Sequence, residues 1–266
     1  MQLTLRTRRL LAGGLLALAC AAAALRLTGP GAVCRAGDLT DIPDDTGFLP
    51  RAQAAEADGQ KWVALTFDDG PSRNTEPILD ILAEQQVPAT FFVVTAENNE
   101  KWLPMLERIQ ADGHQIGLHS CTHEYSKVYS STTDFWADIK ALKEKLAPYV
   151  PDPEALTWLR FIGGSTNTVS HRYGGSQIMT RLKEQAEERG YHSIDWNVSA
   201  EDAAGGHPDA QTILRNIVKD AKDRNVCVVL MHDTKATDTT VEALPDIISW
   251  FKENGYQFCT VADLPQ

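Results

Sequence analysis

The sequence KWVALTFDDGP occupies residues 61–71 and joins an apolar run to an acidic turn. Its β-branched and aromatic residues predict a buried strand over residues 61–67. Two adjacent carboxylates, Asp68 and Asp69, follow that strand, and a glycine and a proline then bend the chain. Most turns of this composition simply face solvent. If both carboxylates point into one pocket, however, a cation can neutralise one of them while the other accepts protons.

Six further segments have the same strand-like composition, and each of the first six strands is followed by a segment with helical spacing. The predicted strands are residues 61–67, 90–95, 114–118, 157–162, 191–196, 226–231 and 256–261. This alternation of strands and helices is typical of a parallel sheet.

Apolar residues recur at helical spacing most clearly over residues 131–146 and in the last helix, which is predicted to end at Asn254 and Gly255. In the first of these helices the residues predicted to face the sheet are Phe135, Ile139, Leu142 and Leu146. The residues predicted to face water are Asp138, Lys140, Lys143 and Glu144.

Seven parallel strands form either an incomplete barrel or an open, doubly wound sheet. The polar residues distinguish the two folds, because reactive side chains lie at or just beyond the C-terminal ends of five predicted strands. They are Asp68 with Asp69, His119, Arg160, Asp195 and His232. Barrels gather their catalytic loops at this end of the strands, so the sequence predicts an α/β fold of the barrel type.

The chain divides into three parts. Residues 1–36 carry three early arginines and then an uncharged apolar run over residues 10–25, which predicts export by a cleaved signal peptide or an uncleaved membrane anchor. Residues 37–60 are polar and acidic without periodicity and are interpreted as a linker. Residues 61–266 form the predicted folded domain.

The charge of the chain disfavours nucleic acid as a partner. The net charge is -11, and residues 1–36 hold five arginines and no acid, so the rest carries -11 - 5 = -16. Such a field repels phosphate backbones and favours a neutral or cationic substrate. The five cysteines are an odd number without paired spacing, and Cys227 and Cys259 are interpreted as small buried side chains.

Two imidazoles, His119 and His123, lie four residues apart, a spacing that predicts one face of a helical turn. Taken alone, two histidines at this spacing more often lie on the surface or in the core than bind a metal. Together with the carboxylates after residue 67 it predicts three protein ligands and an open fourth position, the arrangement of a catalytic zinc site. Cys121 lies between the histidines, and its side chain is expected to point away from them.

An apolar strand delivers His232 at its end, where the imidazole either caps the strand or donates protons. Asp195 and Arg160 are candidate orienting charges, with structural ion pairs as the alternative. Gly163 and Gly164 expose backbone N–H groups, which indicates an oxyanion site or a plain turn.

Five ordered blocks together resemble the polysaccharide deacetylases of the NodB-homology type, the fourth carbohydrate esterase family, over residues 61–264. The blocks are residues 66–71, 119–123, 160–167, 195–197 and 230–233. The resemblance implies a distorted (β/α)7 barrel. It also implies an enzyme that removes N-acetyl groups from N-acetylglucosamine residues of a cell-wall-type polysaccharide. Peptidoglycan is the first candidate for that polymer.

The resemblance further implies a role for each matching position. Asp69, His119 and His123 would bind one divalent metal ion, with zinc preferred over cobalt or manganese. Asp68 would be the general base, positioned by Arg160, and His232 the general acid, oriented by Asp195. The residues implied to contact the substrate are Gly163, Trp196 and Leu230.

One position departs from the family pattern, because Ile162 stands where the third block usually has proline. Proline fixes φ, so its loss is expected to loosen the oxyanion loop. Two other functions stay open from the sequence. One is an O-acetyl xylan esterase or another amide hydrolase of the same family, and the other is a catalytically silent carbohydrate-binding barrel. A monomer is expected.

Overall fold

The computed structural model describes residues 59–265. The predicted signal or anchor segment, residues 1–36, and nearly all of the predicted linker therefore lie outside the described residues. None of the helices within residues 59–265 combines the length and apolar character needed to cross a membrane.

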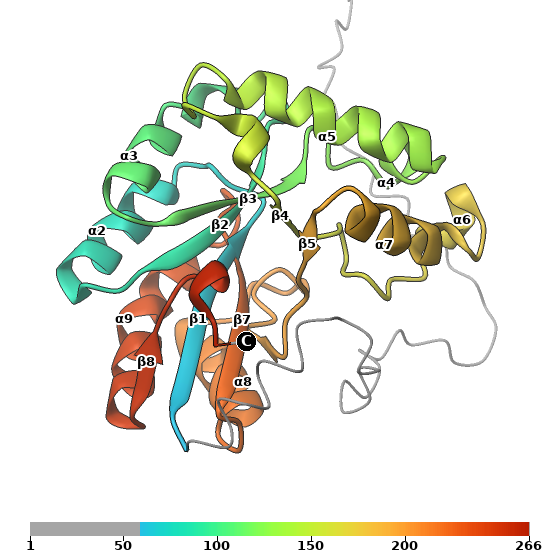
Figure 1. Cartoon of the computed structure of the whole chain (residues 1–266). Coiled ribbons are helices and arrows are strands. Elements are labelled where there is room, and N and C mark those ends of the chain that lie inside the picture. The colour runs from blue at the N-terminus through green and yellow to red at the C-terminus, as the bar shows by residue number, and fades with distance from the viewer. Residues whose placement is uncertain (1–58, 266) are drawn as a thin grey trace, which may run out of the picture. The chain divides into compact units, whose positions relative to one another are not determined.

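Strands and helices alternate along the chain (Figure 1). The strands are β1 (Lys61–Asp68), β2 (Ala89–Val94), β3 (Gln115–Ser120), β4 (Trp158–Leu159), β5 (His192–Ser193), β6 (Val198–Ser199), β7 (Val226–His232) and β8 (Tyr256–Phe258). The α-helices are α2 (Thr75–Gln85), α3 (Met105–Ala111), α4 (Tyr125–Val128), α5 (Thr132–Leu146), α6 (His171–Gly174), α7 (Ile178–Glu188), α8 (Ala210–Ala221) and α9 (Asp238–Glu253). Short 3₁₀ turns are η2 (Glu100–Trp102), η3 (Pro153–Ala155) and η4 (Val261–Asp263).

The strands form one curled parallel sheet. Its order is β5-β4-β3-β2-β1-β7-β6, and β8 pairs with the first residues of β1. The two end strands, β5 and β6, are separated in the chain only by residues 194–197. Because so few residues join the opposite ends of the sheet, it must curl nearly closed. The predicted distorted (β/α)7 barrel is confirmed.

The strand count differs from the prediction of seven. The structure adds β6, and it shortens the predicted strands over residues 157–162 and 191–196 to two residues each. The β6 strand was missed because it has two residues and Val198 is its only buried apolar residue, too few to produce a pattern.

Alternate residues of each strand face opposite sides of the sheet. On β1, Val63, Leu65 and Phe67 belong to the large core between sheet and helices. Ala64 belongs to a second, smaller cluster with Phe92 and others on the inner side. Asp68 shares the inner face with Ala64, so the sheet's own period directs this carboxylate into the barrel.

Helix α5 differs from its prediction at two charged residues. The predicted apolar stripe is buried as expected, but Asp138 and Lys143 are also buried rather than in water. Each of these two side chains contacts residues outside the helix. The Lys143 ammonium lies 3.3 Å from the Glu154 carboxylate and 5.0 Å from the Tyr191 ring centroid, and Asp138 lies under the turn after β3.

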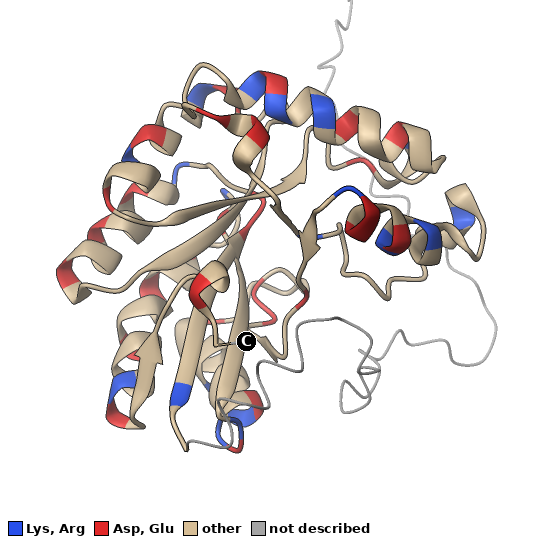
Figure 2. Cartoon of the chain, in the orientation of Figure 1, with Lys and Arg blue, Asp and Glu red and all other residues tan. Residues whose placement is uncertain are grey.

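The end of α9 agrees with the prediction, because Asn254 follows the helix and Gly255 has a φ of 78°. Cys227 and Cys259 are buried free thiols, as predicted. Figure 2 shows that charged residues concentrate on the outer helices and the loops, whereas the strands are almost free of them. The few charges that strands and strand ends do carry therefore mark the site.

Candidate active site

Three potential metal ligands meet at the C-terminal ends of β1 and β3. Asp69 follows β1, His119 lies in β3, and His123 lies in the turn after it. Asp69 Oδ1 is 3.4 Å from His119 Nε2 and 3.1 Å from His123 Nε2. This carboxylate oxygen is buried and has no hydrogen-bond partner among residues 59–265. A buried, unpaired carboxylate oxygen facing two imidazole nitrogens is the kind of arrangement that a cation completes.

His119 is oriented for coordination through its second ring nitrogen. Its Nδ1 lies 2.7 Å from the Arg160 carbonyl oxygen, which can only accept, so Nδ1 carries the proton and Nε2 faces Asp69. Burial opposes ionisation of Asp69, but the two imidazoles beside it outweigh burial and hold the pKa of Asp69 well below its usual range. An ionised carboxylate and two imidazoles fit one divalent cation.

The two histidines do not share a helical turn. Strand β3 ends at Ser120, and His123 adopts a left-handed backbone with φ 55°. The His123 N–H donates to Ser120 Oγ at 2.8 Å. The prediction that the imidazoles meet is confirmed by a ring-centroid distance of 5.3 Å. The predicted helical geometry is wrong, because a side-chain-stabilised turn brings them together.

Asp68 lies beside this cluster and is held by Arg160. Arg160 Nη1 donates to Asp68 Oδ1 at 2.8 Å, and both side chains are nearly inaccessible, at 0% and 5% exposed. The other guanidinium hydrogen bonds go to the Thr66 hydroxyl and to the carbonyl oxygens of Ile194 and Asp195. The predicted pairing of Arg160 with Asp68 is confirmed. It leaves Asp68 Oδ2 as the oxygen nearer the metal ligands, 4.0 Å from His119 Nε2.

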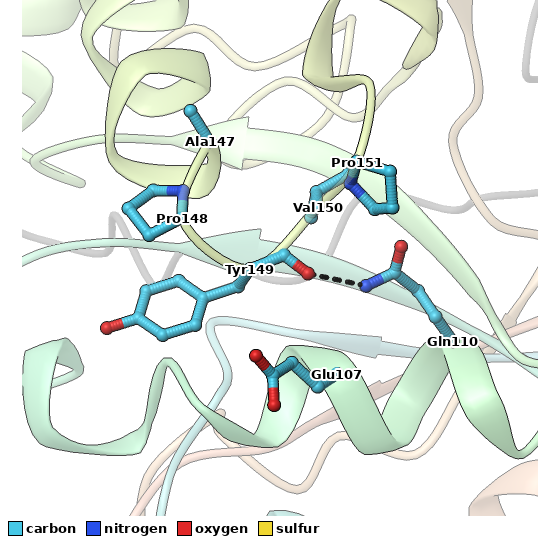
Figure 3. Close-up of a pocket in the computed structure, with 7 residues that line it drawn as sticks. All are labelled: Glu107, Gln110, Ala147, Pro148, Tyr149, Val150 and Pro151. Carbon is cyan, nitrogen blue, oxygen red and sulfur yellow. Dashed lines mark hydrogen bonds between the residues drawn. The ribbon is translucent and has the colours of Figure 1, made fainter.

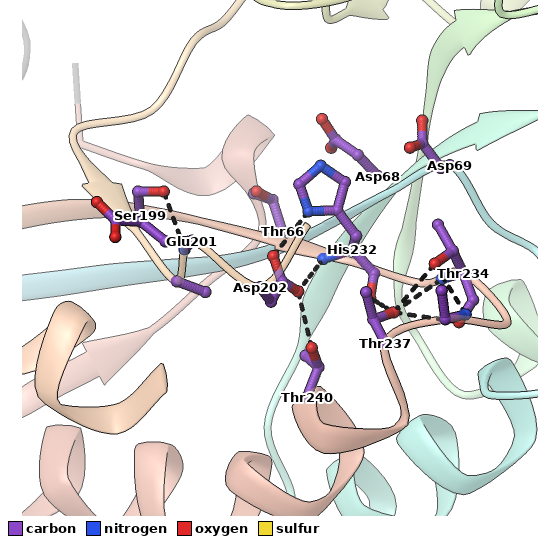
Figure 4. A network of polar contacts seen from close by, with 12 residues as sticks. Thr66, Asp68, Asp69, Ser199, Glu201, Asp202, His232, Thr234, Thr237 and Thr240 are labelled. Carbon is purple, nitrogen blue, oxygen red and sulfur yellow. Dashed lines mark hydrogen bonds and ion pairs between the residues drawn. The ribbon is translucent and has the colours of Figure 1, made fainter. Parts of the chain in front are cut away.

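His232 ends β7 directly opposite Asp68, because the two residues are register partners on neighbouring parallel strands. One carboxylate, Asp202, orients it (Figure 4). Asp202 Oδ1 lies 2.8 Å from His232 Nδ1, and Oδ2 accepts the His232 N–H at 2.8 Å and the Thr240 hydroxyl at 2.7 Å. Burial disfavours the imidazolium, but Asp202, with the charges of Asp68 and Asp69, raises the pKa of His232 to about 9.

The prediction that Asp195 orients His232 is wrong. The Asp195 carboxylate instead accepts the N–H of Ser165 at 2.8 Å and its hydroxyl at 2.6 Å. Asp195 therefore fixes the loop after β4. The orienting residue was missed because Asp202 follows β6, the strand that the sequence pattern did not indicate. Without a predicted strand, no sequence signal marked Asp202 as an acid beyond a strand end, as one did for Asp68.

The predicted oxyanion loop follows β4. Gly163 has a φ of 73°, and its N–H has no hydrogen-bond partner in the described part of the chain. The Ile162 carbonyl accepts the Tyr129 hydroxyl at 2.9 Å and the Asn167 amide at 3.2 Å. With its side chain also buried, Ile162 anchors the loop by contacts rather than by a proline ring.

Tyr125 is a further residue at this loop that the sequence did not single out. A Cβ atom placed on Gly163 would lie 2.3 Å from the Tyr125 hydroxyl oxygen. The tyrosine therefore occupies the space in which a side chain at residue 163 would stand. Only glycine fits there without movement.

The two other predicted substrate-contacting residues lie on the inner side of the sheet. Trp196 packs partly against the inner cluster and beside Gly164, whose added Cβ would lie 3.3 Å from its ring. Leu230 precedes His232 by two residues and so shares its face of β7, where it is 7% exposed. Both positions are compatible with a wall of the site.

A separate hollow of about 400 Å³ lies on the outer surface between α3 and the turn after α5 (Figure 3). Glu107, Gln110 and residues 147–151 line it, and the Gln110 amide donates to the Tyr149 carbonyl oxygen at 3.0 Å. The residues that line this hollow do not include Asp68, the three potential metal ligands or His232, so the hollow is distinct from the candidate site.

Comparisons with known proteins agree with this geometry. A family model described as polysaccharide deacetylase matches residues 55–194, just over half of the chain. A putative polysaccharide deacetylase of Bacillus subtilis, YheN, is 31% identical, over 84% of this chain and 74% of its own length. A peptidoglycan-N-acetylglucosamine deacetylase of Bacillus cereus is 29% identical, over 77% of this chain and 88% of its own.

A solved structure gives the same result. The catalytic domain of peptidoglycan N-acetylglucosamine deacetylase from Eubacterium rectale superposes with a TM-score of 0.73 at 34% identity, covering 78% of this chain and 91% of that domain. The chain therefore belongs to the polysaccharide deacetylase family and is a hydrolase that acts on amide bonds.

Proposed function

We propose that this enzyme removes N-acetyl groups from N-acetylglucosamine residues of a cell-wall-type polysaccharide, with peptidoglycan as the first candidate. We further propose that zinc is held by Asp69, His119 and His123. The observation that carries the proposal is the pairing of Asp68 with His232 across β1 and β7, directly beside the three-ligand cluster. A base and an acid next to a cation site are the groups that hydrolysis of an amide needs. The choice of peptidoglycan is supported by the names of the relatives from Bacillus cereus and Eubacterium rectale.

Asp69, His119 and His123 would hold a divalent cation, which would supply Lewis-acid charge that polarises an acyl carbonyl and favours ionisation of water. Asp68 acts as the general base. Because Arg160 occupies Oδ1, the proton of the water goes to Oδ2. The resulting hydroxide attacks the acetyl carbon, and negative charge develops on the acetyl oxygen, where the free N–H of Gly163 donates to it.

His232 acts as the general acid. Asp202 occupies its Nδ1, so Nε2 is the nitrogen that donates a proton to the departing amine. With a pKa of about 9 the imidazole is protonated near neutral pH, which is the state a proton donor requires. The C–N bond breaks, and acetate and a free amino sugar leave. Trp196 and Leu230, on the inner side of the sheet, are the side chains proposed to contact the sugar.

The proposal places the enzyme outside the cytoplasm, because its polymer lies there and residues 1–36 have the composition of a signal peptide or a membrane anchor. We propose that the enzyme acts as a monomer. Nucleic acid is not a proposed partner, because the acidic charge of the chain repels it.

Acetate release from the purified full chain tests this function. We expect release from peptidoglycan and from N-acetylglucosamine oligomers, its loss on chelation and its recovery with zinc, cobalt or manganese in parallel assays. Asp68→Asn should lower the rate by about 100-fold or more while zinc still binds. Asp134→Asn, an exposed position on α5, serves as the matched control.

Three outcomes would contradict the proposal. Acetate release that is undiminished by chelation would exclude a catalytic role for the metal. Full activity of Asp68→Asn with zinc bound would exclude Asp68 as the general base. Faster release from acetylated xylan than from any N-acetylated polymer identifies an O-acetyl esterase instead.

A further inference from the structure

Asp138 of α5 is a buried carboxylate beneath the turn that joins the two histidine ligands. It is 8% exposed, and its contacts within the described residues are hydrogen bonds from neutral groups. Its two oxygens accept four hydrogen bonds from three consecutive residues. Oδ2 accepts the Ser120 hydroxyl at 2.8 Å and the Cys121 N–H at 2.8 Å, and Oδ1 accepts the Thr122 N–H at 3.1 Å and its hydroxyl at 2.9 Å. A charge buried without a cation is costly unless it is hydrogen-bonded in this way.

The Ser120 hydroxyl extends this network to His123. While its proton points to Asp138, its oxygen accepts the N–H of His123 at 2.8 Å and that of Thr122 at 3.2 Å. Asp138 is thus connected to the backbone of a metal ligand through one intervening side chain.

His123 needs such support because its φ of 55° is unfavourable for any residue with a side chain. Backbone conformations of this kind persist at functional sites where the surroundings over-determine them. The imidazole of His123 lies 3.1 Å from Asp69 only because the chain turns in this conformation.

We infer that Asp138 is a positioning residue for the metal site, which fixes the turn over residues 120–123 and thereby the place where His123 meets the cation. The inference rests on the proposed function, because it concerns the same three ligands. It extends that function by assigning a role to a helix residue that contacts neither metal nor substrate.

The network requires a carboxylate and not merely a polar group. A hydroxyl can rotate and become an acceptor, but a backbone N–H cannot. In Asp138→Asn the amide nitrogen must replace either Oδ2, which accepts the Cys121 N–H, or Oδ1, which accepts the Thr122 N–H. Either orientation leaves one backbone donor facing another donor, so the turn must shift.

Zinc affinity of the full chain, measured by competition with a chromogenic chelator, tests the inference without any activity assay. We expect Asp138→Asn to weaken zinc binding about 10-fold to 100-fold, the range seen when groups that orient metal ligands are removed. The visible absorption bands of the cobalt-substituted protein should change as well, because His123 then binds in a different geometry. Asp134→Asn, on the same helix but exposed, should leave affinity and bands unchanged.

A purely structural role for Asp138 gives a different result. In that case Asp138→Asn lowers the unfolding temperature of the metal-free protein but keeps wild-type zinc affinity and cobalt bands, and the inference is overturned. If Asp138→Asn does not fold, Ser120→Ala removes the link to His123 and keeps the carboxylate. A loss of affinity of about tenfold in that variant supports the inference, and unchanged affinity overturns it.

Failure of the inference and failure of the proposed function are distinguishable. A wild-type chain that binds zinc but releases no acetate contradicts the function and still allows the Asp138 test. A wild-type chain that binds no zinc overturns both.

Discussion

His232 and Asp202 are joined twice, because one carboxylate lies 2.8 Å from the Nδ1 of the imidazole and accepts the backbone N–H of the same residue at 2.8 Å. Ring and backbone of His232 are therefore held by one group that is almost inaccessible, with a side chain 1% exposed. This double contact fixes the tautomer and direction of the ring. It also places a negative charge where it stabilises the imidazolium.

The first prediction concerns the pH dependence of Asp202→Asn. A general acid works in its protonated form, so activity falls as pH rises through the pKa of His232, which is about 9 with Asp202 present. Removing the Asp202 charge lowers that pKa. The alkaline limb of kcat should therefore move to lower pH by about one unit or more, measured by acetate release between pH 6 and 10.

Asp195→Asn is the matched control for this experiment. Its carboxylate contacts Ser165 and not the imidazole, so the alkaline limb should stay where it is in the wild type. A limb that moves in Asp195→Asn but not in Asp202→Asn would contradict the assignment.

The second prediction concerns Gly163→Ala. The added Cβ would lie 2.3 Å from the Tyr125 hydroxyl oxygen, so loop and tyrosine must separate. Because small displacements of catalytic groups are costly, kcat should fall about tenfold or more. Adding Tyr125→Phe removes that oxygen and leaves the ring carbon Cζ at 3.4 Å, so the double variant should recover part of the loss.

Gly175→Ala separates the clash from backbone strain. Gly175 also has a positive φ, 81°, but no atom lies within 4 Å of its added Cβ. The Gly175→Ala variant should therefore have a lower stability than the wild type and the same kcat. Equal kcat values for Gly163→Ala and the wild type would show that the loop does not need its present position.

Elements with strong periodicity were predictable from the sequence. The strands β1, β2, β3 and β7 are long and apolar, and the stripe of α5 repeats over four turns. The strands β4, β5 and β6 have two residues each, and their place is set by pairing with longer neighbours. Short strands of that kind leave no periodic signal, so the prediction gave two of them wrong lengths and missed the third.

Site residues were predictable where they directly end a strand, as Asp68 and His232 do. The contact between Asp202 and His232 was not, because Asp202 follows β6, a two-residue strand without a periodic signal, and reaches His232 through the curl of the sheet. Asp138 was misassigned for a related reason. On a helix, charged residues normally face water, and only the folded position of the Ser120 turn converts this one into an acceptor for four donors.

The third prediction concerns removal of the metal. A cation that binds only the folded chain stabilises it by mass action, by about 4 kcal/mol at a free concentration 1,000 times Kd. Chelation should lower the unfolding temperature, and added zinc should restore it. Asp69→Asn should abolish this response, because the residue is a ligand, whereas Asp68→Asn should keep it, because Arg160 and not the cation holds that carboxylate. If Asp68→Asn instead abolished the response and Asp69→Asn kept it, Asp68 would be the metal ligand and Asp69 would not.

The fourth prediction concerns Asp233, which is buried behind the site and accepts the hydroxyls of Ser72 and Thr75. Burial raises its pKa from 3.8 to about 6, so the fold favours its neutral form. The stability from this preference is fully present below pH 3.8 and is lost as pH rises to 6. The loss amounts to about 3 kcal/mol, since each pKa unit corresponds to 1.36 kcal/mol.

An amide does not titrate in this range, so Asp233→Asn should gain stability relative to the wild type as pH rises from 4 to 7. Urea unfolding at several pH values, with chelator present throughout to exclude metal binding, measures the difference. Asp209→Asn gives the opposite sign, because the side chain of Thr212 and its N–H, which donates to the Asp209 carboxylate at the start of α8, lower the pKa of Asp209. The stability that Asp209 contributes is lost as pH falls rather than as it rises. Parallel pH profiles for Asp233→Asn and the wild type would mean that Asp233 is ionised at little cost inside the fold.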